Sequence, residues 1–95
     1  MYSYEIQPSL QKVLKKLSKK DKKLYEQILK KIDEIINSEN VEHYKNLRND
    51  MKDRKRVHLG HFVLIFKFIK NDSKIVFVDF DYHDKIYLRK NKNIY

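Results

Sequence analysis

The sequence predicts an α+β fold in which a hairpin of two helices packs on a small, mostly antiparallel sheet, in the order β-α-α-β-β-β. Apolar residues recur at helical spacing between positions 10 and 36, and three short apolar runs follow position 53. The single glycine, Gly60, separates the first two of these runs, where a tight hairpin turn needs a flexible residue. With 95 residues, the chain is expected to form one domain over positions 1–95.

A short strand and two helices are expected in the first third of the chain. Polar and apolar residues alternate over positions 3–7, after which Pro8 interrupts the strand and Ser9 is the expected N-cap of the first helix. The apolar stripe of this helix consists of Leu10, Val13, Leu14 and Leu17. Residues 18–21 resemble a capping box, which predicts a second helix that ends near Asn37.

Strands are expected over residues 54–59, 62–70 and 74–82. Residues 71–73 (Asn-Asp-Ser) have the composition of the turn between the last two. Residues 39–53 show no clear periodicity, so the sequence predicts only a short helical turn or irregular structure there.

Positive charge is the outlying feature of the composition. The chain has 22 Lys and Arg against 13 Asp and Glu, a formal net charge of +9. This excess favours a polyanionic partner such as nucleic acid, or an acidic protein, although a lysine-rich proteome would also produce it. The absence of cysteine excludes disulfides and thiolate chemistry. The longest apolar run, Phe62 to Phe66, is too short to span a bilayer, so a cytoplasmic protein without membrane contact is expected.

Groups suited to proton transfer and phosphate binding occur on two of the expected strands. Because strand side chains alternate, Arg54, Arg56 and His58 share one face, and the helices should cover the other. His83 shares a face with two aspartates of the last strand, but the sequence does not fix whether that face is the one bearing His58.

Metal-independent RNA cleavage requires a base, an acid and cations, and two imidazoles with a guanidinium can supply them. One imidazole would take the proton of the 2′-hydroxyl, the other would protonate the leaving 5′-oxygen, and Arg56 would hold the phosphate. Ordinary surface histidines are the competing interpretation. A metal site at His58, His61 and His83 with Asp79 or Asp81 is disfavoured, because no compact ligand spacing occurs.

Two segments resemble motifs of the RelE/ParE toxin superfamily. Residues 56–66 (RVHLGHFVLIF) resemble its hairpin motif R-x-R-V-G-D-Y-R-V-I-Y, and residues 81–87 (DYHDKIY) resemble its closing motif G-H-R-x-D-I-Y. The order of elements is also similar. The resemblance implies a toxin of a type II toxin–antitoxin pair, which cleaves mRNA in the ribosomal A site without metal or cofactor. It also implies a cognate antitoxin that blocks the toxin.

The resemblance implies roles for individual residues. The catalytic set matches the motifs by position, with histidines as in YafQ-like members, and consists of Arg56, His58, His83 and Tyr87. Val63 stands where the hairpin motif has an arginine, which favours either the histidine-dependent branch or a relative with weak or lost catalysis. The missing charge would then come from the basic residues before the hairpin, which are the expected substrate ligands: Lys52, Arg54 and Lys55.

Two alternatives to the ribonuclease remain open. The first is a non-enzymatic toxin like the ParE branch, which binds DNA gyrase, although such a binder has no need of both histidines. The second is a basic RNA-binding domain, which would require exposed aromatic platforms on the sheet. Most of the phenylalanines are instead expected in the core of so small a domain.

Overall fold

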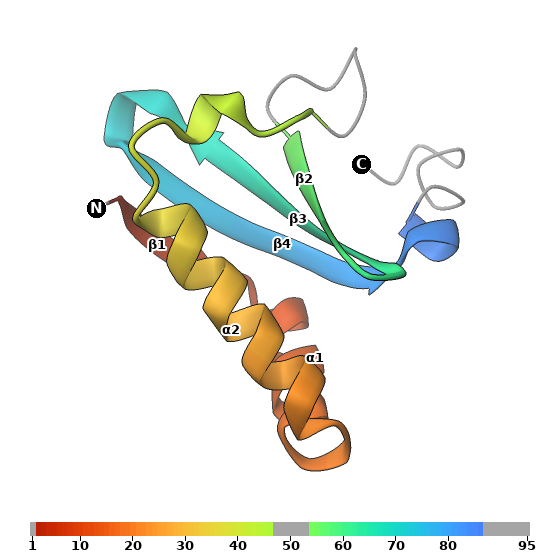
Figure 1. Ribbon diagram of the computed structural model, residues 1–95. Coiled ribbons are helices and arrows are strands. Elements are labelled where there is room, and N and C mark those ends of the chain that lie inside the picture. The colour runs from red at the N-terminus through yellow and green to blue at the C-terminus, as the bar shows by residue number, and fades with distance from the viewer. Residues whose placement is uncertain (1, 47–53, 87–95) are drawn as a thin grey trace.

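The computed structural model describes residues 2–46 and 54–86, and it has the predicted two-layer architecture (Figure 1). Strand β1 (Ser3–Ile6) leads into helices α1 (Pro8–Lys20) and α2 (Lys22–Ile36). These are followed by the short 3-10 helix η1 (Val41–His43). The remaining elements are β2 (Arg54–Leu59), β3 (Phe62–Ile69), the short 3-10 helix η2 (Lys70–Asp72) and β4 (Lys74–Tyr82).

The four strands form one sheet in the order β1-β4-β3-β2, with the helix hairpin on one face. β2, β3 and β4 are antiparallel neighbours, while β1 lies parallel to β4 at the edge. The register shifts between Ile65 and Phe66 of β3, where Val78 of β4 bulges out of the pairing. After β4, residues 83–86 continue as a helical turn.

The turn at Gly60 and the bounds of the strands confirm the sequence-based prediction. Gly60 has a φ of 61°, in the left-handed region that favours glycine. In the second connection Ser73 adopts φ 47°, which ends η2 and starts β4. The predicted strands over 54–59 and 74–82 are observed without change, and the middle strand ends one residue early, at Ile69.

The expected helix caps are wrong by a few residues. α1 begins at Pro8 with Gln7 in the N-cap position, because proline at the first helical position loses no helical hydrogen bond. Ser18 lies inside α1, where its Oγ donates to the Lys15 carbonyl at 2.6 Å. The residue between the helices is Asp21, whose Oδ1 accepts from the Leu24 backbone N–H at 3.2 Å and caps α2.

The main core lies between the helices and the sheet. Fully or almost fully buried residues come from both helices and from the inward positions of the two central strands, including Leu10, Ile28, Ile35, Phe66 and Phe77. Within the described ranges, none of the helices is both long and apolar enough to cross a membrane.

Candidate active site

The sheet face opposite the helices, here called the open face, carries the basic row of β2. Val57 and Leu59 pack against the main core on the helix side, so the alternating residues Arg54, Arg56 and His58 lie on the open face. This arrangement confirms the expected orientation of the strand.

Strand pairing places the polar end of β4 on the same face. His58 is directly opposite Val63 of β3, and Val63 is directly opposite Asp81 of β4. Because directly paired residues project to the same side of a sheet, His58 and Asp81 share the open face. The register that the sequence left undecided therefore brings the two polar strands together.

His58 and His83 lie side by side. Their ring centroids are 5.5 Å apart and the ring planes differ by 25°. His83 begins the helical turn that follows β4, and its backbone N–H donates to the His61 carbonyl at 2.9 Å. This bond ties the end of β4 to the β2–β3 turn, so it holds the two imidazoles at the same end of the sheet.

Arg56 is positioned by three hydrogen bonds. Its Nη1 donates to Nε2 of His58 at 2.8 Å, and its Nε donates to the Asn46 carbonyl at 3.2 Å. Its backbone N–H donates to the Lys45 carbonyl at 2.9 Å. Because a guanidinium can only donate, Nε2 of His58 must be unprotonated.

The electrostatic surroundings of His58 favour its neutral form. Partial burial lowers the pKa of His58 below its ordinary value of 6.5, and the positive charges of Arg56, His83 and Lys45 lower it further. An imidazole that is neutral near pH 7 is suited to accept a proton.

A pocket of about 410 Å³ opens at this end of the sheet. Its lining residues are His58, Gly60, His61, Tyr82, His83 and Asp84. Oδ1 of Asp84 lies 3.5 Å from Nδ1 of His83, so a carboxylate stands beside the second imidazole. The pocket is therefore polar, and it contains both members of the histidine pair.

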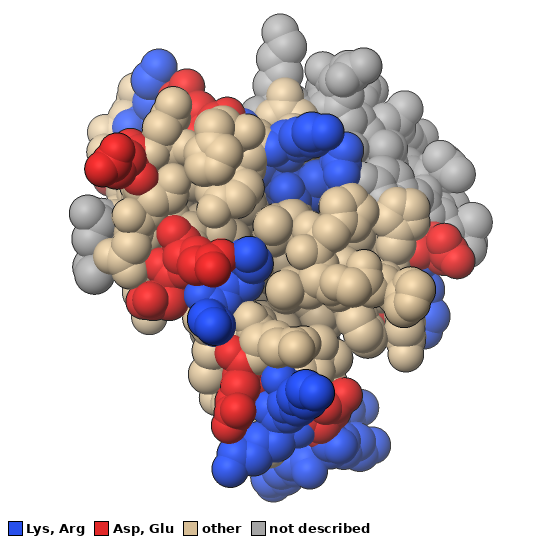
Figure 2. Space-filling model, viewed as in Figure 1, with Lys and Arg blue, Asp and Glu red and all other residues tan. Residues whose placement is uncertain are grey.

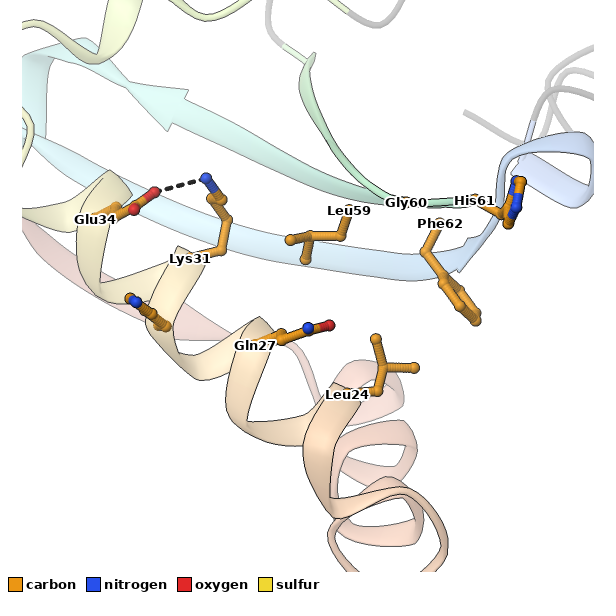
Figure 3. Close-up of a pocket in the computed structure, with 9 residues that line it drawn as sticks. Leu24, Gln27, Lys31, Glu34, Leu59, Gly60, His61 and Phe62 are labelled. Atoms are coloured by element: carbon orange, nitrogen blue, oxygen red, sulfur yellow. Dashed lines mark hydrogen bonds and ion pairs between the residues drawn. The ribbon is translucent and has the colours of Figure 1, made fainter.

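A second pocket, of about 540 Å³, lies between α2 and the β2–β3 turn on the helix side (Figure 3). Leu24, Leu59 and Phe62 supply its apolar wall. Lys31 also lines it, and its amine is 2.6 Å from the Glu34 carboxylate. This larger pocket contains neither His58 nor His83, so the groups suited to RNA cleavage gather in the smaller one.

Val63 has a structural reason to be apolar. It is fully buried on the open face, where it clusters with Ile65 and with Ile86 from the turn after β4. An arginine at this position would have to bury its charge or displace Ile86. The apolar residue therefore belongs to a small second core that anchors the segment carrying His83.

The predicted substrate ligands differ in where they lie. Arg54 is partly buried on the open face, two residues from Arg56. Lys55 projects to the other side and is 8% exposed, with its amine donating to the Glu42 and Tyr44 carbonyls and to Oδ1 of Asn46 at 3.1–3.3 Å. Lys55 thus has a structural role and is not retained as a substrate ligand. Lys52 and Tyr87 lie outside the described residues.

Lys45 is a candidate that the sequence did not indicate. Asn46 forms an isolated antiparallel bridge with Lys55, which places residues 44–46 alongside β2. Tyr44 packs into the main core and the Asn46 side chain reaches Lys55, so both project to the helix side. The alternation leaves exposed Lys45 on the open face next to Arg56. No periodicity in this irregular segment could have revealed that placement.

No family model matches the chain. It is 54% identical over 91 residues to "Putative toxin RelE4" of Methanocaldococcus jannaschii, covering 95% of each chain. It is 46% identical over 88 residues to an uncharacterized protein of Methanosarcina mazei, covering 92% of this chain and 100% of the other.

The fold of the chain is similar to solved structures of the E. coli RelE toxin. The isolated E. coli RelE toxin aligns with a TM-score of 0.69 and 21% identity over 100% of both chains. RelE in the E. coli RelBE toxin–antitoxin complex aligns with a TM-score of 0.68 and 20% identity, covering 86% of this chain and 96% of that one. These structural likenesses establish a common fold.

Proposed function

Because the chain belongs to the RelE family of toxins, we propose that it is the toxin of a type II toxin–antitoxin pair that cleaves mRNA on the ribosome. The paired imidazoles of His58 and His83, with Arg56 bound to the first, are the observation that supports this activity. The two histidines supply a base and an acid within one polar pocket, and Arg56 is a phosphate ligand hydrogen-bonded to the first of them.

The proposed reaction uses the substrate's own 2′-hydroxyl as the nucleophile. His58 takes the hydroxyl proton on Nε2 while the 2′-oxygen bonds to phosphorus, and the bond from phosphorus to the 5′-oxygen breaks. His83, in its protonated form, gives a proton to that leaving oxygen. The products are a 2′,3′-cyclic phosphate and a free 5′-hydroxyl, so atoms and charge balance without a metal or cofactor.

The basic residues of the open face would stabilise the charge that builds up on the phosphate. Arg56 exchanges its bond to His58 for a phosphate oxygen when substrate enters, which also frees Nε2 to accept the proton. Arg54 and Lys45 flank Arg56 and bind adjoining phosphates. Tyr87 is proposed as an assisting or stacking group on the basis of its motif position alone.

The proposed partners are the ribosome with its bound mRNA and a cognate antitoxin. The E. coli structure with a similar fold is a RelBE toxin–antitoxin complex. An antitoxin of this chain is expected to bind so that the pocket with His58 and His83 is closed to RNA. Translation in the cytoplasm would be the process that the free toxin inhibits.

The test is translation and mRNA cleavage on purified ribosomes with the parent chain, His58→Ala and His83→Ala. Each variant should lower the cleavage rate by about 10²–10⁴-fold, the usual contribution of a proton-transfer group. His43→Ala is the matched control, because His43 contacts the Asn40 carbonyl and lies outside the pocket. Its cleavage rate should equal that of the parent.

A message with a 2′-deoxy nucleotide at the cleaved position tests the nucleophile separately, and it should remain intact. Full toxicity of His83→Ala would contradict the proposed chemistry. Inhibition of DNA supercoiling with no effect on translation would instead identify a binder of the ParE kind.

A further inference from the structure

The turn between α1 and α2 carries the densest positive charge of the chain. Four exposed lysines surround Asp21 there, and they are named the lysine tip: Lys19, Lys20, Lys22 and Lys23. Figure 2 shows blue side chains, those of Lys and Arg, gathered over the end of the helix hairpin. Between positions 12 and 23 the sequence has seven lysines and one aspartate, so these 12 residues contribute +6 to the net charge of +9.

Helix electrostatics explain only half of this cluster. Lys19 and Lys20 lie in the last turn of α1, where a cation is favourable for the helix dipole. Lys22 and Lys23 lie in the first turn of α2, where the dipole is positive and a cation is unfavourable. The Asp21 carboxylate at the N-cap offsets part of this cost, and the first turn itself contains no acidic residue. The helix dipole therefore gives no reason for lysines at these two positions.

Within residues 2–46 and 54–86, no ion pair neutralises the charge of the lysine tip. In the described part of the chain, the lysines that form ion pairs with glutamate are Lys31, Lys70 and Lys74. The carboxylate nearest in sequence to the tip, Asp21, is engaged as the cap of α2 through its bond to the Leu24 N–H. The tip thus presents a concentrated positive field on a rigid helical support.

The choice of residue indicates the kind of anion. All four arginines of the chain come after position 47, and two of them, Arg54 and Arg56, lie at the candidate active site. The tip uses lysine alone. Arginine suits directed, two-pronged binding of one phosphate, whereas clustered lysines act as point charges along a phosphate backbone without reading bases.

We propose that the lysine tip is a second RNA-binding surface, which lies outside the catalytic pocket. It would bind the phosphate backbone of a structured RNA duplex. Figure 1 places the tip at the free end of the helix hairpin, on the helix side of the sheet, whereas the basic row of β2 lies on the open face. A contact there would raise the effective concentration of the toxin at a large RNA assembly without altering the cleavage chemistry.

The experiment measures binding to a fluorescent RNA hairpin that carries 2′-O-methyl groups throughout, so that cleavage cannot occur. Lys22→Glu/Lys23→Glu should weaken binding roughly tenfold at about 100 mM salt and lower the slope of log affinity against log salt by about two. The same variant should keep or raise Tm, because it removes cations from the start of α2.

Lys30→Glu/Lys70→Glu is the matched control, since it changes the net charge equally at exposed positions outside the tip. It should retain most of the affinity and the full salt slope. Equal losses in both double variants would show that overall charge alone matters and would overturn the proposal. Unchanged affinity in the tip variant, or a lowered Tm, would also overturn it, pointing to a protein partner or a structural role.

This test is separate from that of the proposed function. The uncleavable RNA reports binding whether or not His58 and His83 transfer protons, and the cleavage step of the tip variant can be assayed on mRNA bound to purified ribosomes at saturating toxin. The cleavage rate at saturation should stay at the parental value. Loss of it would show that the tip belongs to the catalytic site, which contradicts a second surface.

Discussion

The buried residues on the two faces of the sheet have different roles. The helix-covered face holds the large core, with Phe66 and Phe77 fully buried beneath α1 and α2. Among the described residues, the open face has a small buried cluster of Val63, Ile65 and Ile86. This narrow apolar strip is flanked by the basic row of β2 and by the polar end of β4. The first face determines the fold, while the small cluster determines where His83 stands relative to His58.

Truncation of one buried side chain on each face tests this difference and should have the largest effects. Phe66→Ala should lower the free energy of unfolding by about 3–5 kcal/mol, because it leaves a large cavity in the main core. Ile86→Ala should cost about 2 kcal/mol, at the lower end for such a change, because its cluster is small and can partly collapse. Denaturant unfolding measures both.

Cleavage by the folded fraction should show the opposite order. Ile86→Ala loosens the turn that begins at His83, so its rate per folded molecule should fall, while that of Phe66→Ala should stay near the parental rate. If the two variants lost activity only in proportion to unfolding, the open-face cluster would have no positioning role.

Two lysines on opposite faces provide the second comparison. Lys55→Met keeps the apolar stem but removes the donor to three oxygens, which should lower the free energy of unfolding by about 2 kcal/mol. Lys45→Met should change stability by less than about 0.5 kcal/mol, because Lys45 is exposed. Lys45→Met should instead reduce the salt slope of substrate binding by about one. A large loss of stability in Lys45→Met would contradict its assignment to the site.

The smallest expected effect concerns pH. His58 must be unprotonated to act as a base, so cleavage should be present above its pKa and lost as pH falls through it. Because that pKa is lowered, the acidic limb of the rate profile should lie below pH 6.5. Arg56→Gln removes one cause of the lowering and should move both the limb and the NMR titration of His58 to higher pH. A titration that moved to lower pH would contradict the electrostatic role of Arg56.

Most of the fold could be predicted because local patterns dictate it. The apolar spacing of α2 and the alternation of β2 each reflect burial on one side only, and Gly60 marks the turn. The caps were misplaced because Ser9 and Ser18 are compatible with a helix interior, so a serine alone does not define a boundary.

The candidate site could be predicted only in part, because its formation depends on pairing over long distances in the sequence. The histidine and arginine positions followed from alternation, but their convergence required the register of β3 with both neighbours. The burial of Lys55 depends on oxygens from residues 42–46, which have no readable periodicity. The reason for an apolar residue at position 63 is likewise a long-range one, because Val63 forms a buried cluster with Ile86.

The parallel pairing of β1 with β4 has a consequence for synthesis of the chain. Ser3 pairs with Lys74 and Ile6 with Phe77, so β1 leaves the translating ribosome early but cannot pair until β4 has emerged. His58 likewise cannot pair with His83 until then, because His83 follows β4 directly. The same late segment completes both the sheet and the imidazole pair. The proposed active site is therefore complete only after His83 has left the ribosome that is making the chain.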